Sequence, residues 1–152
     1  MEADGSRKKV KFMLVSGWNA NNGARNYNGY FEGGMTIVVP VGWRVEITLR
    51  NQDGNYPHSI VVTIPYLPDA IPKNAGYRDA AIKRAFTTEP EKGLFANTED
   101  TLRFKTKKPG KYHLFCGVPG HGLGGMWTLF ESSDQADAPY VLIADGVEPG
   151  RD

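Results

Sequence analysis

The sequence predicts an all-β protein, built as a sandwich or a barrel of short strands. Apolar and polar side chains alternate over short runs, as they do in half-buried strands. Clusters of Gly, Pro and Asn separate these runs, and one segment alone has the character of a helix. A chain of 152 residues is also long enough for one domain with a sizeable core.

Strand signals recur along the whole chain. The first run is β-branched and apolar, and a turn-rich stretch, 17–34, follows it. The run 43–49 alternates most regularly, with apolar side chains at its odd positions and polar ones at its even positions, as in an antiparallel strand with one solvated face. The predicted strands are 10–15, 35–39, 43–49, 59–64, 101–105, 111–116, 126–131 and 140–144.

Residues 74–86 differ from the rest of the chain. Apolar residues at Ala81, Ile82, Ala85 and Phe86, with charged residues between them, predict a short helical insertion flanked by prolines. No repeat or linker divides the sequence. We therefore expect a single domain over residues 1–152, with 1–9 and 145–152 as loose termini.

Composition excludes several functional classes. The 18 Lys and Arg residues balance 17 Asp and Glu residues, so a net charge of +1 gives no sign of a nucleic-acid partner. No apolar run approaches the length of about 18 residues that a transmembrane segment needs. The N-terminus lacks the apolar core of a signal peptide. One cysteine excludes an internal disulfide.

The stretch "FCGVPGHGLGGMW" carries the chemistry. Cys116, His121 and Met126 follow one another at steps of five in a glycine-rich loop, directly after a predicted strand. Alternation along that strand points His113 away from Cys116, so a second imidazole in the site has to come from His58. A thiolate, two imidazoles and a weak thioether form the ligand set of a blue copper electron-transfer site. We expect one copper ion per chain.

Each of these four residues, taken singly, could have a purely structural role. A lone cysteine, for example, is usually a small buried apolar group. The conjunction of all four residue types at this spacing favours a metal site. A catalytic multicopper centre would need more histidines than His113, which leaves at most a detached blue-copper domain of such an enzyme. A cysteine hydrolase is disfavoured because His113 points away from Cys116. A copper carrier or storage protein would have clusters of Cys or Met, whereas this chain has one cysteine.

The sequence also resembles a known family. "YHLFCGVPGHGLGGMW" is similar to the ligand loop of the sulfocyanin family of cupredoxins, and "GMTIVVPVGW" and "PHSI" resemble its upstream strand and first-histidine motifs. The C-x4-H-x4-M spacing is also that of rusticyanins. The resemblance covers residues from about 10 to 131. It implies a Greek-key β-sandwich with one mononuclear copper, and by position it assigns the ligands as His58, Cys116, His121 and Met126.

The resemblance further implies an electron-transfer role rather than an enzymatic one. Such a protein shuttles electrons in a respiratory chain outside the cytoplasmic membrane, in the periplasm or on the outer face of the cell membrane. Its partners would be redox proteins such as a quinol-oxidising complex, a cytochrome or a terminal oxidase. We expect a monomer without a transmembrane segment in this chain.

Four further residues are candidates for supporting roles. Ser59 follows His58, as in rusticyanins, and a hydrogen bond near the copper-bound sulfur should tune the reduction potential there. Small residues around His121 should let its imidazole edge approach solvent, as an exit for electrons. Val118, Pro119 and Leu123 would surround it with a flat apolar patch for brief docking of a partner.

Overall fold

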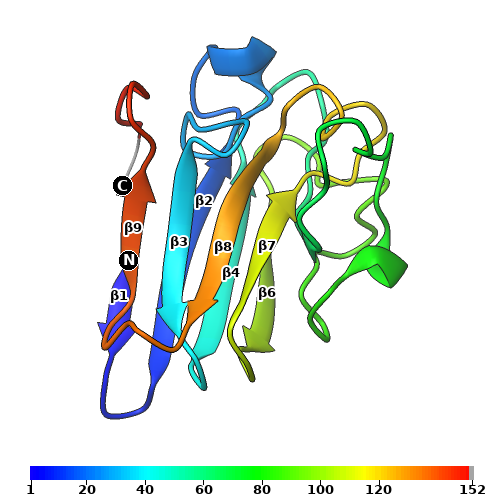
Figure 1. Cartoon of the computed structure of the whole chain (residues 1–152). Helices are drawn as coiled ribbons and strands as arrows, with labels where there is room; N and C mark the ends of the chain where they lie inside the picture. The colour runs from blue at the N-terminus through cyan, green and yellow to red at the C-terminus, as the bar shows by residue number, and fades with distance from the viewer. Residues whose placement is uncertain (151–152) are drawn as a thin grey trace.

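The protein is an all-β sandwich, as the sequence predicts. A computed structural model describes residues 1–150 and folds them into two mixed sheets (Figure 1). In spatial order, one sheet contains β1 (Glu2–Asp4), β2 (Lys9–Ser16), β4 (Arg44–Asn51) and β6 (Glu99–Lys105). The other contains β5 (Val61–Thr63), β7 (Gly110–Phe115), β8 (Trp127–Ser133), β3 (Met35–Pro40) and β9 (Tyr140–Ile143).

The predicted strands are confirmed apart from their ends. The largest difference is at β5, which is shorter than the predicted run 59–64 because residues 58–60 bond with neighbouring loops instead. Residues 2–4, expected within a loose terminus, form β1 and pair antiparallel with β2, although their side chains are exposed. At the other terminus, the backbone N–H of Gly150 donates to the hydroxyl of Tyr30.

The predicted helix over 74–86 is wrong. The segment contains one turn of 3-10 helix, η2 (Tyr77–Asp79), and is otherwise irregular. Its backbone groups bond to other parts of the fold: the N–H of Ala81 donates to Val62, and the carbonyl of Ala85 accepts from Val62. Arg84 has a φ of 64°, which an α-helix excludes. Long-range pairing with β5 therefore overrides the local helical pattern.

One apolar core lies between the sheets. The apolar side chains of β4 point into it and the polar ones point out, as the alternation predicts. Leu102 and Phe104 of β6 are buried against the same core. No helix among residues 1–150 is long and apolar enough to cross a membrane.

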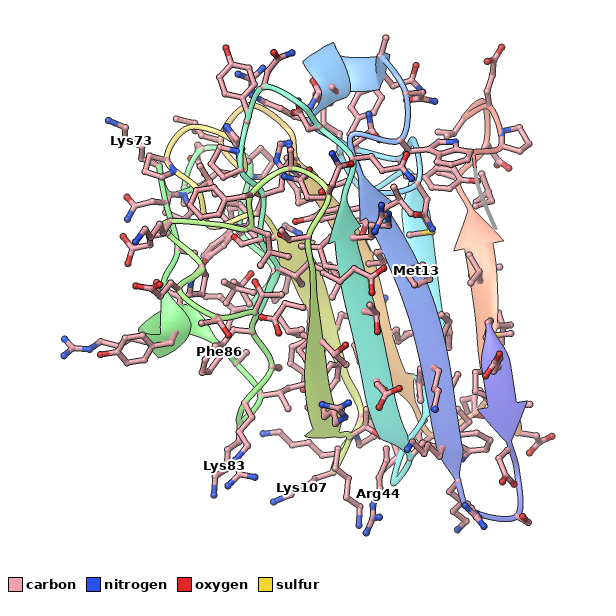
Figure 2. The ribbon with its side chains drawn as sticks, turned by 180° about the vertical axis from the view of Figure 1, so that it is seen from behind. Met13, Arg44, Lys73, Lys83, Phe86 and Lys107 are labelled. Carbon is pink, nitrogen blue, oxygen red and sulfur yellow. The ribbon has the colours of Figure 1, made fainter. Side chains whose placement is uncertain are left out.

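The topology brings three loops to one end of the sandwich. β2, β4 and β7 all end at the top of Figure 1, so the loops that follow them, 17–34, 52–60 and 117–126, meet there. Basic side chains lie at the opposite end, where Figure 2 shows Arg44, Lys83 and Lys107 projecting. The loop end is where the candidate ligands gather.

Candidate metal centre

Three of the predicted ligands form a compact cluster at the loop end. Donor atoms of His58, Cys116 and His121 all lie within 4.8 Å of one another. The Cys116 Sγ is 4.0 Å from Nδ1 of His58 and 3.6 Å from Nδ1 of His121. His58 and Cys116 are fully buried and His121 is 5% exposed. Both imidazoles therefore turn the same ring nitrogen toward the sulfur.

Backbone pairing fixes the cluster from two sides. Cys116 directly follows β7, and its N–H donates to the carbonyl of Met126, while the N–H of Met126 donates to the carbonyl of His121. The loop is thus tied back on itself just before β8 begins. His58 exchanges backbone hydrogen bonds with Leu94 on the other side of the site. Met126 is fully buried in the same core cluster as Cys116.

Two loop glycines are required by close approach. A Cβ on Gly122 would overlap the ring of Phe115, and one on Gly117 would overlap the carbonyl oxygen of Ala75. The backbone of the loop also bonds to this neighbouring segment, because Ala75 N–H donates to the Gly117 carbonyl. The glycine content of the loop therefore reflects tight packing as well as flexibility.

Burial sets the electrostatics of the cluster. It raises the pKa of the Cys116 thiol, while hydrogen bonds from the backbone N–H groups of Ser59 and Val118 act in the opposite direction. It lowers the pKa of His58, against the effect of Asp53. Burial also lowers the pKa of His121 to about 4, helped by nearby His58 and Arg25. The imidazoles are therefore held neutral, with lone pairs available to a metal ion.

Ser59 ties three segments together around the site. Its Oγ donates to the carbonyl of Pro90 (2.6 Å) and accepts from the backbone N–H of Gly117 (2.9 Å). Its own carbonyl accepts a hydrogen bond from the hydroxyl of buried Tyr27. Ser59 is thus in contact with the backbone that presents the cysteine. Its predicted influence on a reduction potential stays a prediction.

His113 lies apart from the cluster. Its ring stacks on Trp127, with centroids 4.4 Å apart, and it packs near Tyr66 on the outer side of β7. Cys116 instead faces the main core. His113 and Cys116 therefore lie on opposite faces, as the alternation along β7 predicts.

The surface above His121 is a hollow rather than the flat patch that we expected. The hollow has a volume of about 530 Å³, and Val118 and Pro119 line it together with Arg25 and Tyr56. The Tyr56 ring meets the His121 ring edge-on, with centroids 6.0 Å apart. Leu123 is 53% exposed nearby on the loop and does not line the hollow.

Sequence reasoning missed Asp53. This residue is 5% exposed, and its Oδ2 lies 2.7 Å from Nε2 of His58. Burial alone would raise the pKa of Asp53, but hydrogen bonds from the backbone N–H of Asn55 and from His58 bring it below its ordinary value. A carboxylate five residues before a candidate ligand histidine, in the turn "NQDGNYPH", was the available signal.

The donor set fits copper. A buried cysteine sulfur and two imidazole nitrogens converge on one point, and a methionine is hydrogen-bonded through its backbone to two of these residues. Soft sulfur donors with imidazoles suit both Cu(I) and Cu(II), and this combination is that of blue copper sites. A two-sheet sandwich with such a cluster among the loops at one end defines a cupredoxin.

The particular family follows from the sequence comparison. The chain belongs to the sulfocyanin family, because the family model "Sulfocyanin (SoxE) domain" matches residues 1–143. It is 28% identical to the sulfocyanin of Sulfolobus acidocaldarius over 144 residues, which are 91% of this chain and 70% of the relative. It is also 28% identical to the rusticyanin of Acidithiobacillus ferrooxidans over 92 residues, covering 60% of this chain and 56% of that relative.

Solved structures agree on the fold. Reduced auracyanin from Roseiflexus castenholzii superposes with a TM-score of 0.57 at 18% identity, covering 87% of this chain and 99% of that one. Auracyanin A, a "blue" copper protein from Chloroflexus aurantiacus, gives a TM-score of 0.56 at 15% identity, covering 82% and 99%. Reduced rusticyanin gives 0.54 at 18% identity, covering 83% and 80%. The predicted resemblance to sulfocyanins and cupredoxins is confirmed.

Proposed function

We propose that the protein is a type 1 blue copper protein that carries single electrons between redox partners. His58, Cys116 and His121 would hold one copper ion, with Met126 as a weaker fourth ligand. The buried convergence of the three donor atoms within 4.8 Å carries this proposal. Membership of the sulfocyanin family supports it independently of the geometry. Because both sheets share one core cluster, we also propose that residues 1–152 act as one domain.

The chain supplies a preformed ligand frame. A copper ion held by one thiolate, two imidazoles and a thioether would supply one-electron chemistry between Cu(I) and Cu(II). Cys116 and Met126 stand at the adjoining ends of β7 and β8, whose register is fixed by a ladder of backbone hydrogen bonds. Leu94 and Ser59 hold the His58 side of the site. A frame held this way keeps its donors in place in both oxidation states, which makes electron exchange fast.

His121 is the proposed point of exchange. Its ring borders the hollow that Val118, Pro119 and Tyr56 line, whereas His58 is fully buried beneath it. A partner that enters this hollow would meet the edge of His121, the most exposed of the proposed ligands. Leu123, exposed on the same loop, provides apolar contact beside the hollow. A small contact of this kind suits a short-lived redox encounter.

We infer the cellular role of the protein from its membership of the sulfocyanin family. Redox partners of the kinds expected above, namely a quinol-oxidising complex, a cytochrome or a terminal oxidase, would deliver or accept the electrons on the extracytoplasmic side of the membrane. We propose a monomer that is not itself an enzyme. The leading alternative is a copper carrier, which would need a site that releases its metal readily, whereas the cluster here is buried.

Copper titration of matched variants tests this function. The wild-type protein should bind one copper ion per chain and develop an intense thiolate-to-copper absorption. Cys116→Ser should lose the absorption because the thiolate is gone, and His58→Ala should lose copper. His113→Ala is the control, since its ring lies on the far side of β7. Equal loss of copper from the His113 and His58 variants would show that the ligands are misassigned.

A further inference from the structure

Asp53 lies directly behind one of the proposed copper ligands. Its side chain is only 3% exposed, and its Oδ2 accepts a hydrogen bond from Nε2 of His58 at 2.7 Å. The other oxygen, Oδ1, accepts from the backbone N–H groups of Asn55 (2.9 Å) and Tyr56 (3.3 Å). Both oxygens are therefore satisfied by donors, as an ionised carboxylate requires.

The surrounding backbone is shaped to hold this carboxylate. Asn51 Oδ1 accepts the backbone N–H of Asp53 at 2.9 Å. Gly17, at a φ of 69°, passes so close that a Cβ on it would lie 2.8 Å from the Cβ of Asp53. Asp53 is thus enclosed between two loops and fixed in one orientation toward the ring of His58.

The hydrogen bond selects one tautomer of His58. Because Nε2 donates its proton to the carboxylate, the lone pair is on Nδ1, the nitrogen that faces the Cys116 sulfur. A carboxylate behind a ligand histidine also makes the imidazole a stronger donor. The tautomer needed for metal binding is therefore set before any metal arrives.

No lysine or arginine among residues 1–150 lies within ion-pair distance of Asp53. Its one close side-chain partner is His58, which burial keeps neutral. A buried carboxylate needs a compensating positive charge. With the thiolate of Cys116 and the carboxylate of Asp53, a site holding Cu(II) sums to zero, whereas one holding Cu(I) sums to −1. The carboxylate therefore favours the oxidised state.

We propose that Asp53 is a positioning residue for the copper site, which fixes the metal-binding tautomer of His58 and lowers the reduction potential through its buried negative charge. This inference rests on the proposed function for its second part. The first part concerns the metal-free protein alone.

Two variants and one control separate the charge from the hydrogen bond. Asp53→Asn has the same shape and retains an oxygen acceptor, but it removes the charge. Asp53→Ala removes both. Glu32→Gln is the control, because Glu32 is an exposed carboxylate beside Gly125 of the ligand loop. It removes one negative charge near the site where solvent screens it.

The first measurement is the reduction potential of each copper-loaded protein. Removing a hydrogen-bonding partner of a metal ligand typically costs 10–100-fold in metal affinity. We expect Asp53→Asn to lose about tenfold more affinity for Cu(II) than for Cu(I), which raises the potential by about 59 mV for one electron. A potential that moves no more than that of Glu32→Gln, or that falls, overturns the charge role.

The second measurement needs no copper. Nitrogen-15 NMR of the metal-free wild-type protein at neutral pH should show His58 protonated on Nε2, and Asp53→Ala should show a mixture of tautomers. A proton on Nδ1 of His58 in the wild type overturns the positioning role. A wild-type protein that gives no coloured copper complex overturns the proposed function instead, and the NMR result still decides how Asp53 acts on His58.

Discussion

Replacing Ser59 by Ala should loosen the ligand loop by removing one hydroxyl. In the folded protein this hydroxyl accepts from the Gly117 N–H and donates to the Pro90 carbonyl, and all three residues are buried. The substitution leaves two buried polar groups without these partners. An unsatisfied buried donor or acceptor costs about 1–3 kcal/mol. We therefore expect Ser59→Ala to lower the free energy of unfolding by about 2–6 kcal/mol.

Thermal unfolding of the metal-free protein measures this loss directly. A destabilisation of 1 kcal/mol lowers the melting temperature of a domain of this size by about 2–4 °C, so a fall of at least about 4 °C is expected. Metal-free protein is used because bound copper would add its own stabilisation to the folded state. Circular dichroism at 25 °C confirms that the variant is folded before the melt.

Ser132 on β8 provides the matched control. It is also buried, at 2% exposure, but its Oγ has no hydrogen-bond partner among the described residues. Ser132→Ala should therefore leave the melting temperature unchanged or raise it slightly. If Ser59→Ala costs no more than Ser132→Ala, the two hydrogen bonds do not hold the loop, and the reasoning from buried partners fails.

Four further outcomes are expected. Met126→Leu should raise the reduction potential because Cu(II) loses more from a missing donor than Cu(I), and Met126→Gln should lower it; potentiometry that finds neither shift would show that Met126 does not touch the metal. Leu123→Asp should slow electron exchange in stopped-flow measurements with a redox protein while leaving the copper spectrum intact, and an unchanged rate would place docking elsewhere. Metal-free protein should keep its β-sheet circular dichroism but melt at a lower temperature than the copper form, and a chain without sheet signal would contradict the independent core. Burial lowers the pKa of His113, so the unfolded chain binds its proton first and stability should fall as the pH drops below about 6.5. In unfolding curves between pH 7 and pH 5, His113→Phe should lose less stability than the wild type, and an equal loss in the two proteins would contradict this contribution of His113.

The alternation of side chains and the spacing of residues within one segment predicted most of the strands and part of the candidate site. Strand β4 follows from its period-two alternation because one face of it packs on the core. The cluster of Cys116 with His121 follows from their spacing in a loop that must fold back, and the histidine count left His58 as the remaining donor. These inferences need no knowledge of which distant segments meet.

Long-range contacts account for what the sequence did not predict. The segment 74–86 has a helical pattern, but the N–H of Ala81 and the carbonyl of Ala85 form hydrogen bonds with Val62 of β5. These pairings are incompatible with a continuous helix over the segment. Asp53 is a polar residue in a polar turn until the loop folds and brings it against His58. The hollow over His121 is likewise lined in part by Asn22 and Tyr56, which are far from the ligand loop in the sequence.

This chain should hold one copper ion as a one-electron carrier, and a spectroelectrochemical titration of the wild-type protein measures this property. One equivalent of Cu(II) should produce an intense visible absorption from the Cys116 thiolate, with the EPR signal of a single type 1 site. Reduction should bleach that absorption with one electron per chain, and reoxidation should restore it in full. A colourless copper complex, or an absorption that does not return on reoxidation, would show that the chain is not a blue copper electron carrier.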